Sequence, residues 1–176
     1  MEAEEPDRSV RSLSPESTEE IGERLGRSLV AGSLVGLIGD LGSGKTTFVR
    51  GLARGLEVEE PVHSPTFTRM RELPGRLTLY HFDAWRPGSE ALFEEGLEFL
   101  AGAGVSVVEW ADRVERWLPH PRIEMRLRQA RPAERELSFR VLPAGPAQGR
   151  TARELEAALR KAVEALESGW QESGEL

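Results

Sequence analysis

Residues 39–46 of this 176-residue chain read GDLGSGKT, which fits the pattern G-x-x-x-x-G-K-[ST]. Glycines in such a loop let successive backbone N–H groups point at phosphate oxygens, and the N-terminus of the following helix adds its positive dipole end. The pattern therefore predicts a nucleotide-phosphate site. Its loop residues would be Asp40, Gly42, Ser43 and Gly44.

The residues that end the loop carry side chains for phosphate and metal binding. Lys45 is expected to bridge the terminal phosphates, and the Thr46 hydroxyl is expected to hold Mg²⁺. Thr47 could add an N–H group and a hydroxyl toward the inner phosphates. Only Lys45 and Lys161 are lysines, and a compact ammonium fits a phosphate cradle that a planar guanidinium does not. The alternative is a strand–helix connection whose spacing is accidental.

Two acidic residues end short apolar runs and are candidates for the same site. Glu109 follows VSVV, as the acid of a Walker B segment does, and would lie near a metal held by Thr46. A surface acid at a strand end is the alternative. Asp83 ends YHFD and could act in the outer sphere of the metal or orient the attacking water. A turn or helix-capping aspartate is the alternative there.

Three other residues have both a functional and a structural interpretation. Thr66, in HSPTFT, is placed like a threonine that senses a γ-phosphate, although a lone loop threonine more often forms a turn. Trp110 could pack on the nucleotide or on a partner. His81 lies on a largely apolar strand alternation, so a core histidine and a functional histidine are equally open.

The charge of the chain bears on its partners. The formal net charge is −7, which argues against strong nucleic-acid binding by this chain alone. A group of arginines could nevertheless face RNA or a protein partner, although a solvated face of a short helix and a strand is favoured. The group comprises Arg113, Arg116, Arg122, Arg126 and Arg128.

Composition excludes several other classes. The chain has no cysteine, so disulfides and thiolate metal sites are excluded. The acidic N-terminus MEAEEPDRSV shows no secretory signal, and no apolar run approaches the roughly 20 residues that span a bilayer. We therefore expect a cytoplasmic protein with neither a membrane nor DNA as a partner.

The elements around the loop predict an α/β domain with a mixed sheet, whose central strands are parallel and flanked by helices. An apolar strand over 33–39 leads into the loop, and a helix follows it. The expected strands are 33–39, 105–110 and two hairpins, one formed by a strand after Pro65 with 76–83 and one by 122–128 with 134–142, the second solvated on one face. The expected helices are 14–32, 46–56, 89–102, 111–117 and 151–169.

Three regions follow from these elements. Residues 1–13 are acidic and aperiodic and are expected to be a disordered tail. A P-loop domain would span 14–150, with either Ser14 or Ser17 capping its first helix. Residues 151–176 would form a C-terminal helical extension.

Several segments together resemble one family. GDLGSGKTTFVRGLARGL, VHSPTFT, LYHFDAWR and GVSVVEWADRVERWLP, in that order and spacing, closely resemble the TsaE (YjeE) family over about residues 14 to 142. The resemblance implies a P-loop fold and an ATPase that is weak alone and depends on partners. It also implies a role in making threonylcarbamoyladenosine in tRNA, where ATP hydrolysis supports turnover of the TsaB–TsaD transferase complex. Contact with tRNA would be indirect, through that complex.

The resemblance also implies residue roles. Lys45 would bind phosphates, Thr46 and Glu109 would serve Mg²⁺, and Asp83 would assist hydrolysis. Thr66 would belong to a switch-like loop. The remaining implied contacts are with the nucleotide: Trp110 near it, and the segment around Ser17 and Thr18 near the adenine.

The chain departs from the family pattern at two places. Ala84 and Trp85 stand where Leu-Tyr is common, and Ala111 stands where proline is usual; the charged residues are kept.

The alternative function is a small nucleotide or metabolite kinase. A guanine-specific GTPase and an ABC-type ATPase are disfavoured, because the chain lacks [NT]-K-x-D and L-S-G-G-Q segments.

Overall fold

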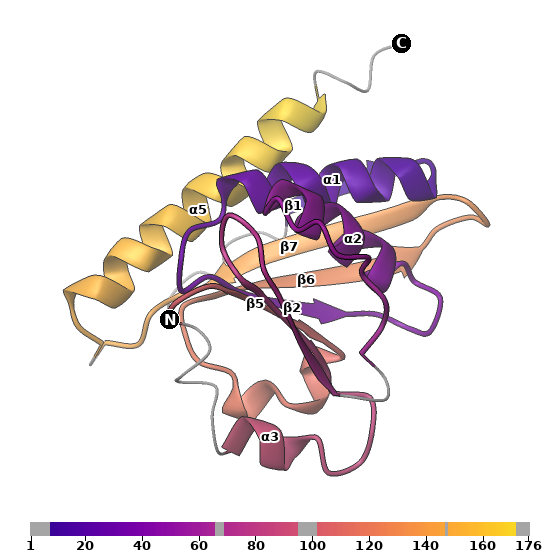
Figure 1. Cartoon of the computed structure of the whole chain (residues 1–176). Coiled ribbons are helices and arrows are strands. Elements are labelled where there is room, and N and C mark those ends of the chain that lie inside the picture. Colours follow the sequence, from indigo (N-terminus) through magenta and orange to yellow (C-terminus); the bar gives the residue numbers. More distant parts are fainter. Residues whose placement is uncertain (1–7, 66–68, 95–101, 147, 172–176) are drawn as a thin grey trace.

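The computed structural model describes residues 8–65, 69–94, 102–146 and 148–171. Within these ranges the chain forms one seven-stranded sheet with helices on both faces (Figure 1). In chain order the elements are β1 (Arg8–Ser12), α1 (Pro15–Ser28), β2 (Leu34–Ile38), α2 (Lys45–Gly55), β3 (Met70–Leu73), β4 (Leu79–Asp83), α3 (Glu90–Glu94), β5 (Val105–Glu109), the 3-10 turns η1 (Ala111–Arg113) and η2 (Glu115–Trp117), β6 (Arg122–Gln129), β7 (Arg135–Leu142) and α5 (Arg150–Gln171).

The sheet has a parallel centre and antiparallel edges. Its order is β1-β7-β6-β2-β5-β4-β3. The neighbours β6–β2, β2–β5 and β5–β4 are parallel, whereas β3–β4, β6–β7 and β1–β7 are antiparallel. The predicted mixed sheet with parallel central strands is confirmed, and both predicted hairpins are present.

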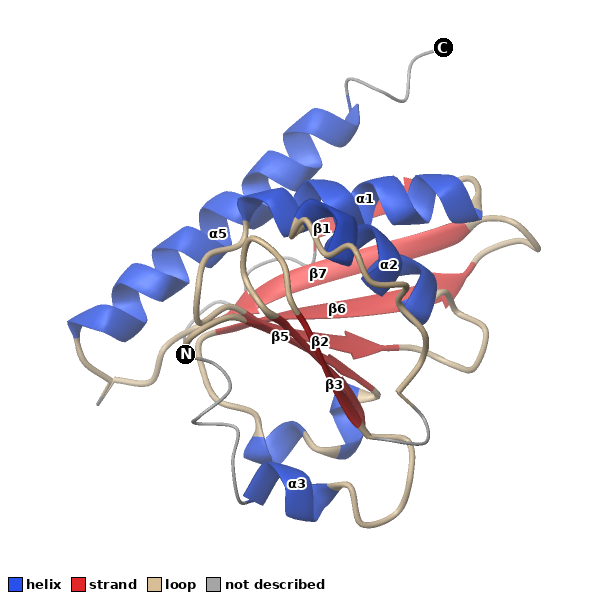
Figure 2. Ribbon diagram, in the orientation of Figure 1, coloured by secondary structure: helices blue, strands red, loops and turns tan. Residues whose placement is uncertain are grey.

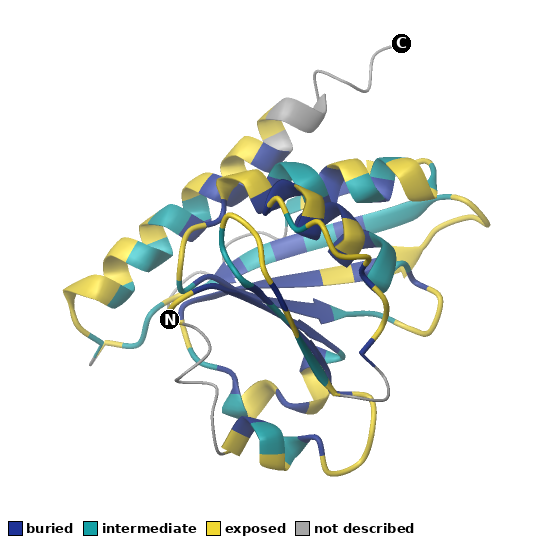
Figure 3. Ribbon diagram, in the orientation of Figure 1, coloured by how far each residue is buried: buried dark blue, intermediate teal, exposed yellow. Residues whose placement is uncertain are grey.

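Two apolar clusters lie on opposite faces of the sheet. Figure 2 shows α1, α2 and α5 on one face and α3 on the other. The larger cluster joins those three helices to the sheet and includes Phe48, Leu52 and Phe139. The smaller one lies between the sheet, α3 and the 3-10 turns, around Phe82 and Val108. The central strands are therefore buried on both faces (Figure 3), as parallel strands usually are.

The N-terminal segment corrects one prediction. Residues 8–12 form β1, so the expectation of a disordered tail over 1–13 is wrong for these residues, while 1–7 lie outside the described ranges. β1 covers the otherwise open edge of β7, and Val10, opposite Leu137, points into the core. Ser14 then caps α1 in a capping box with Ser17.

Helices α1 and α2 approach each other through glycines. A Cβ atom added at any of four positions would clash with backbone of the other helix; these are Gly22, Gly26, Gly51 and Gly55. Arg54 then bonds Glu19 at 2.6 Å and Glu23 at 3.0 Å across the same interface. The close backbone approach fixes the position of α2, whose first turn follows the glycine loop.

Helix α5 is integrated into the main core. The helix predicted over 151–169 is confirmed as α5. Its residues Leu159, Val163 and Leu166 are buried in the same apolar cluster as residues of α1 and β7. Of the predicted helix over 89–102, the structure describes α3 (Glu90–Glu94). Residues 95–101 lie outside the described residues. The predicted short helix over 111–117 is a pair of 3-10 turns.

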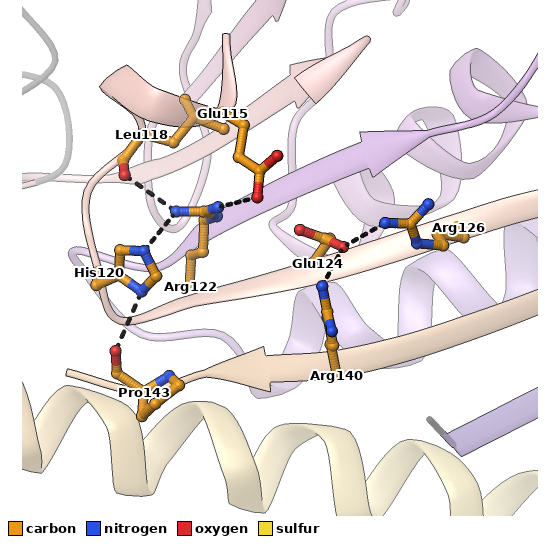
Figure 4. A network of polar contacts seen from close by, with 8 residues as sticks. All are labelled: Glu115, Leu118, His120, Arg122, Glu124, Arg126, Arg140 and Pro143. Atoms are coloured by element: carbon orange, nitrogen blue, oxygen red, sulfur yellow. Dashed lines mark hydrogen bonds and ion pairs between the residues drawn. The ribbon is translucent and has the colours of Figure 1, made fainter. Parts of the chain in front are cut away.

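The arginine group is not a uniformly solvated face. Arg122 is only 2% exposed, and its guanidinium donates to the Leu118 carbonyl at 3.0 Å and lies 3.0 Å from His120 Nε2 (Figure 4). Glu124, on the same strand face, is also buried and bonds Arg126 and Arg140. The expectation of a solvated second face is therefore wrong for β6 at these positions, because η2 and the loop after it cover Arg122.

None of the helices within the described ranges combines the length and the apolar character needed to cross a membrane.

We expect Gly51→Ala to destabilise the fold, because the new methyl group would overlap the backbone of α1 at Glu19. Overpacking of this kind costs about 1–3 kcal/mol of unfolding free energy. Urea unfolding measures the change. Gly102→Ala is the control, since its Cβ would meet no atom of the described residues within 4 Å. Equal midpoints for both variants would contradict the close packing.

Stability should also depend on His120 near pH 6. Burial, and next the Arg122 charge, lower the pKa of His120 below its ordinary 6.5. Between the folded and the unfolded pKa of His120, the unfolded chain therefore binds more protons than the folded chain. The contribution of neutral His120 to the free energy of unfolding is present above about pH 6.5 and is lost as pH falls through the lower folded pKa. Urea midpoints from pH 5 to 8 should fall less steeply on the acid side in His120→Gln; identical pH profiles would contradict this.

Candidate nucleotide site

Three parallel strands end at the same edge of the sheet and bring the acidic candidates together. Leu37 of β2 pairs with Glu109 of β5, and Glu109 pairs with Asp83 of β4. The glycine loop leaves β2 at this edge and leads into α2 (Figure 1). Carboxyl ends of parallel strands are the usual ligand position in open α/β sheets.

The loop has the backbone conformation that its glycines permit. Gly44 caps α2 with φ 102°, and Gly42 has φ 77°, both in the left-handed region that favours glycine. The Lys45 ammonium donates to the carbonyls of Gly39 at 2.6 Å and Asp40 at 2.9 Å. These two hydrogen bonds tie the Lys45 side chain to the backbone of the loop that precedes it.

Lys45 is buried beside an aromatic ring. Its Nζ lies 3.8 Å from the centre of the Trp110 ring, a cation–π distance. Burial lowers the pKa of Lys45, and the nearby carboxylates, Glu109 first and then Asp40, oppose that shift.

Glu109 is bonded from two sides. The Thr46 hydroxyl lies 3.0 and 3.2 Å from its two oxygens, and His81 Nε2 lies 2.9 Å from Oε1. Glu109 is 3% exposed, so the alternative of a surface acid is wrong. The expected proximity of Thr46 and Glu109 is present, and Glu109 is on the strand adjacent to β2.

Asp83 combines a turn contact with a place in the cavity. Its Oδ1 accepts a hydrogen bond from the Trp85 backbone N–H at 2.8 Å, as a turn aspartate does. Ser64 donates to its Oδ2 at 3.3 Å. Asp83 is nevertheless part of the wall that Glu109 and Lys45 share.

Aromatic rings form the far wall. Trp85 and Trp110 lie 4.4 Å apart between ring centres, and the Arg113 guanidinium lies 4.3 Å from the Trp85 ring. Trp110 has φ 61°, an uncommon value for a residue other than glycine. That backbone turn aims its ring back over the loop, where it meets Lys45.

These groups surround one cavity of about 430 Å³. Eight of the residues predicted from sequence line it: Gly42, Gly44, Lys45, Thr46, Thr47, Asp83, Glu109 and Trp110. Asp40 and Ser43 contact Lys45 without lining the cavity. Ser17 and Thr18 are not among the lining residues, and their hydroxyls bond Ser12 and Ser14 in the cap of α1. Thr66 lies outside the described residues.

Sequence reasoning missed some lining residues. Leu41, Ser64, Trp85 and Arg135 also line the cavity, and Arg135 reaches the Gly42 carbonyl at 3.2 Å from the start of β7. The position of Trp85 two residues after Asp83 was a reason in the sequence to place it at the site. No such local reason exists for Arg135, because it reaches the loop only through the pairing of β7 with β6.

The oxygen donors at this edge suit a small divalent cation. Mg²⁺ prefers oxygen ligands and commonly combines one or two protein side chains with nucleotide phosphates. A hydroxyl and a carboxylate, 3.0 Å apart at the end of the phosphate loop, match that requirement.

A strand, a glycine loop and a helix N-terminus at the edge of a largely parallel sheet make this a P-loop NTPase fold. Residues 12–137 match the family described as "Threonylcarbamoyl adenosine biosynthesis protein TsaE". The chain therefore belongs to the TsaE family, whose proteins are involved in tRNA threonylcarbamoyladenosine biosynthesis.

Relatives and a solved structure agree with this assignment. The chain is 44% identical to a TsaE protein of Treponema pallidum over 129 residues, which are 72% of this chain and 96% of that protein. It is 41% identical to TsaE of Bacillus subtilis over 131 residues, covering 73% and 82%. The crystal structure of Bacillus subtilis YdiB superposes with a TM-score of 0.68 at 33% identity, covering 88% of this chain and 95% of that one.

Proposed function

We propose that the chain binds and hydrolyses ATP in this cavity, as part of tRNA threonylcarbamoyladenosine biosynthesis. The observation that carries the proposal is the contact of Thr46 with the buried Glu109 beside the phosphate loop. A loop alone would support nucleotide binding, whereas an adjacent hydroxyl and carboxylate also support metal-assisted phosphoryl chemistry.

Different residues of the chain would bind the phosphates, the metal and the attacking water. Lys45 binds the terminal phosphates, and the loop N–H groups bind the oxygens around them. Thr46 and Glu109 would hold Mg²⁺, which when bound neutralises charge on the phosphates. Asp83, in the same wall, orients the attacking water. Trp110 excludes solvent from the Lys45 side of the cavity.

Two further contacts follow from the family and not from the cavity. The segment around Ser17 and Thr18 approaches the adenine, and Thr66 belongs to a loop that responds to the γ-phosphate. Asp40 and Ser43 contribute in another way, through the loop shape that their contacts with Lys45 stabilise.

Partners complete the proposal. ATP hydrolysis is weak in the isolated chain and supports turnover of a TsaB–TsaD transferase in the cytoplasm. The net charge of −7 fits a protein that contacts tRNA indirectly, through that complex, and does not bind tRNA tightly by itself.

Lys45→Ala should abolish the chain's support of multiple-turnover threonylcarbamoylation with purified TsaB, TsaD, tRNA and ATP, because the terminal phosphates lose their cation. Product per tRNA-modifying complex, measured over many cycles, checks this. The control is Lys161→Ala on α5, which removes the other lysine. Equal turnover with Lys45→Ala would contradict the assignment, and ATP-dependent phosphorylation of a nucleoside from a test panel would favour a kinase.

Glu109→Ala should still bind ATP but lose Mg²⁺-dependent hydrolysis. A loss of about two orders of magnitude in rate is expected, the scale for removing one charge-stabilising group from a site. Binding is measured by titration calorimetry and hydrolysis by phosphate release with TsaB and TsaD present. If the variant supported modification fully, hydrolysis would be irrelevant and the chain would be a nucleotide-switched binding module.

A further inference from the structure

His81 is fully buried on β4, which β5 separates from β2 and its phosphate loop, yet it is bonded to a group of the site. It lies on β4 opposite Val107 of β5, two residues before Asp83. Its Nε2 is 2.9 Å from Glu109 Oε1, while its Nδ1 has no hydrogen-bond partner within the described part of the chain. Among the described residues the side chain therefore has a single polar contact, which is with the candidate metal carboxylate.

The unequal bonding of the two ring nitrogens identifies the tautomer. A hydrogen on Nε2 donates to Glu109 and leaves Nδ1 as a lone pair. The opposite tautomer would set a lone pair against the carboxylate and bury an unbonded N–H group in the core. His81 therefore acts as a donor to Glu109 Oε1.

Glu109 is consequently held between two donors from different elements. His81 bonds it from β4, and Thr46 bonds it from the first turn of α2. Both donors bond Oε1, and the Thr46 hydroxyl also lies 3.2 Å from Oε2, so the plane and rotation of the carboxylate are restrained. A carboxylate at the end of a flexible side chain would otherwise lose rotational entropy when it serves a cation.

We propose that His81 is a positioning residue, which orients the Glu109 carboxylate so that it and Thr46 can serve a divalent cation bound with the nucleotide. The proposal rests on the proposed nucleotide function. Groups that orient ligands through a hydrogen bond typically change metal affinity by 10- to 100-fold when they are removed. A core histidine with no such role would affect stability and leave metal dependence unchanged.

Two polar variants test the proposal. His81→Gln places an amide N–H the same number of bonds from the backbone as Nε2, whereas His81→Asn is one bond shorter and does not reach Glu109. The control is Ser106→Ala on β5, which changes another buried polar group without a partner in the described chain, on the opposite face from Glu109.

The readout is the affinity for ADP, by titration calorimetry, in EDTA and over a range of Mg²⁺ concentrations. All proteins should bind ADP equally in EDTA. In His81→Asn the half-saturating Mg²⁺ concentration should rise at least about tenfold. His81→Gln and Ser106→Ala should stay within about twofold of the parent. Thermal unfolding, measured in parallel, reports any purely structural effect.

Each outcome has a separate meaning. Parent-like Mg²⁺ dependence in His81→Asn, with only a lower unfolding midpoint, would overturn the positioning role and leave the proposed function standing. Failure of the parent protein to bind ADP with or without Mg²⁺ would instead overturn the proposed function. Equal loss in His81→Gln and His81→Asn would also overturn the role, because the restored donor would then be without effect.

Discussion

The hydrogen bonds to the buried Glu109 carboxylate join the parts of the site into one unit. A carboxyl group at 3% exposure is costly to bury unless hydrogen-bond donors replace the water that it loses. Here the donors are Thr46, from the helix that follows the loop, and His81, from the neighbouring strand. Loop, helix and two strands thus meet at one group. A shift of α2 or β4 relative to β5 would break at least one of these bonds.

The position of α2 depends in turn on its contact with α1. Four glycines remove the side chains that would separate the two helices, so their backbones touch. Larger residues would move α2 outward and carry Lys45 and Thr46 away from the ends of β2 and β5. The ion pairs of Arg54 with Glu19 and Glu23 are exposed and add little by themselves, but they fit only the close arrangement.

Local patterns predicted most of this site, and long-range pairing explains what they missed. The strand, loop and helix around Lys45 follow from glycine spacing and apolar runs within about twenty residues. Glu109 is predicted because it is the acidic residue that directly follows an apolar run. β1 was missed because RSVRS has one apolar residue and becomes a strand only by pairing with β7. The burial of Arg122 and the approach of Arg135 to Gly42 likewise arise from elements distant in sequence.

The contacts of Lys45 give the shape of the loop a part in the proposed nucleotide binding. An ammonium has three N–H donors, and three protein acceptors lie within reach: the Gly39 and Asp40 carbonyls and, at 3.5 Å, the Ser43 hydroxyl. The Trp110 ring covers another side. In the proposed function, a phosphate that binds Lys45 would exchange one set of hydrogen bonds for another, and the free energy gained would be only their difference. The glycine torsions, which decide how closely those carbonyls approach, would thereby influence nucleotide affinity in addition to the phosphate contacts proposed for the loop N–H groups.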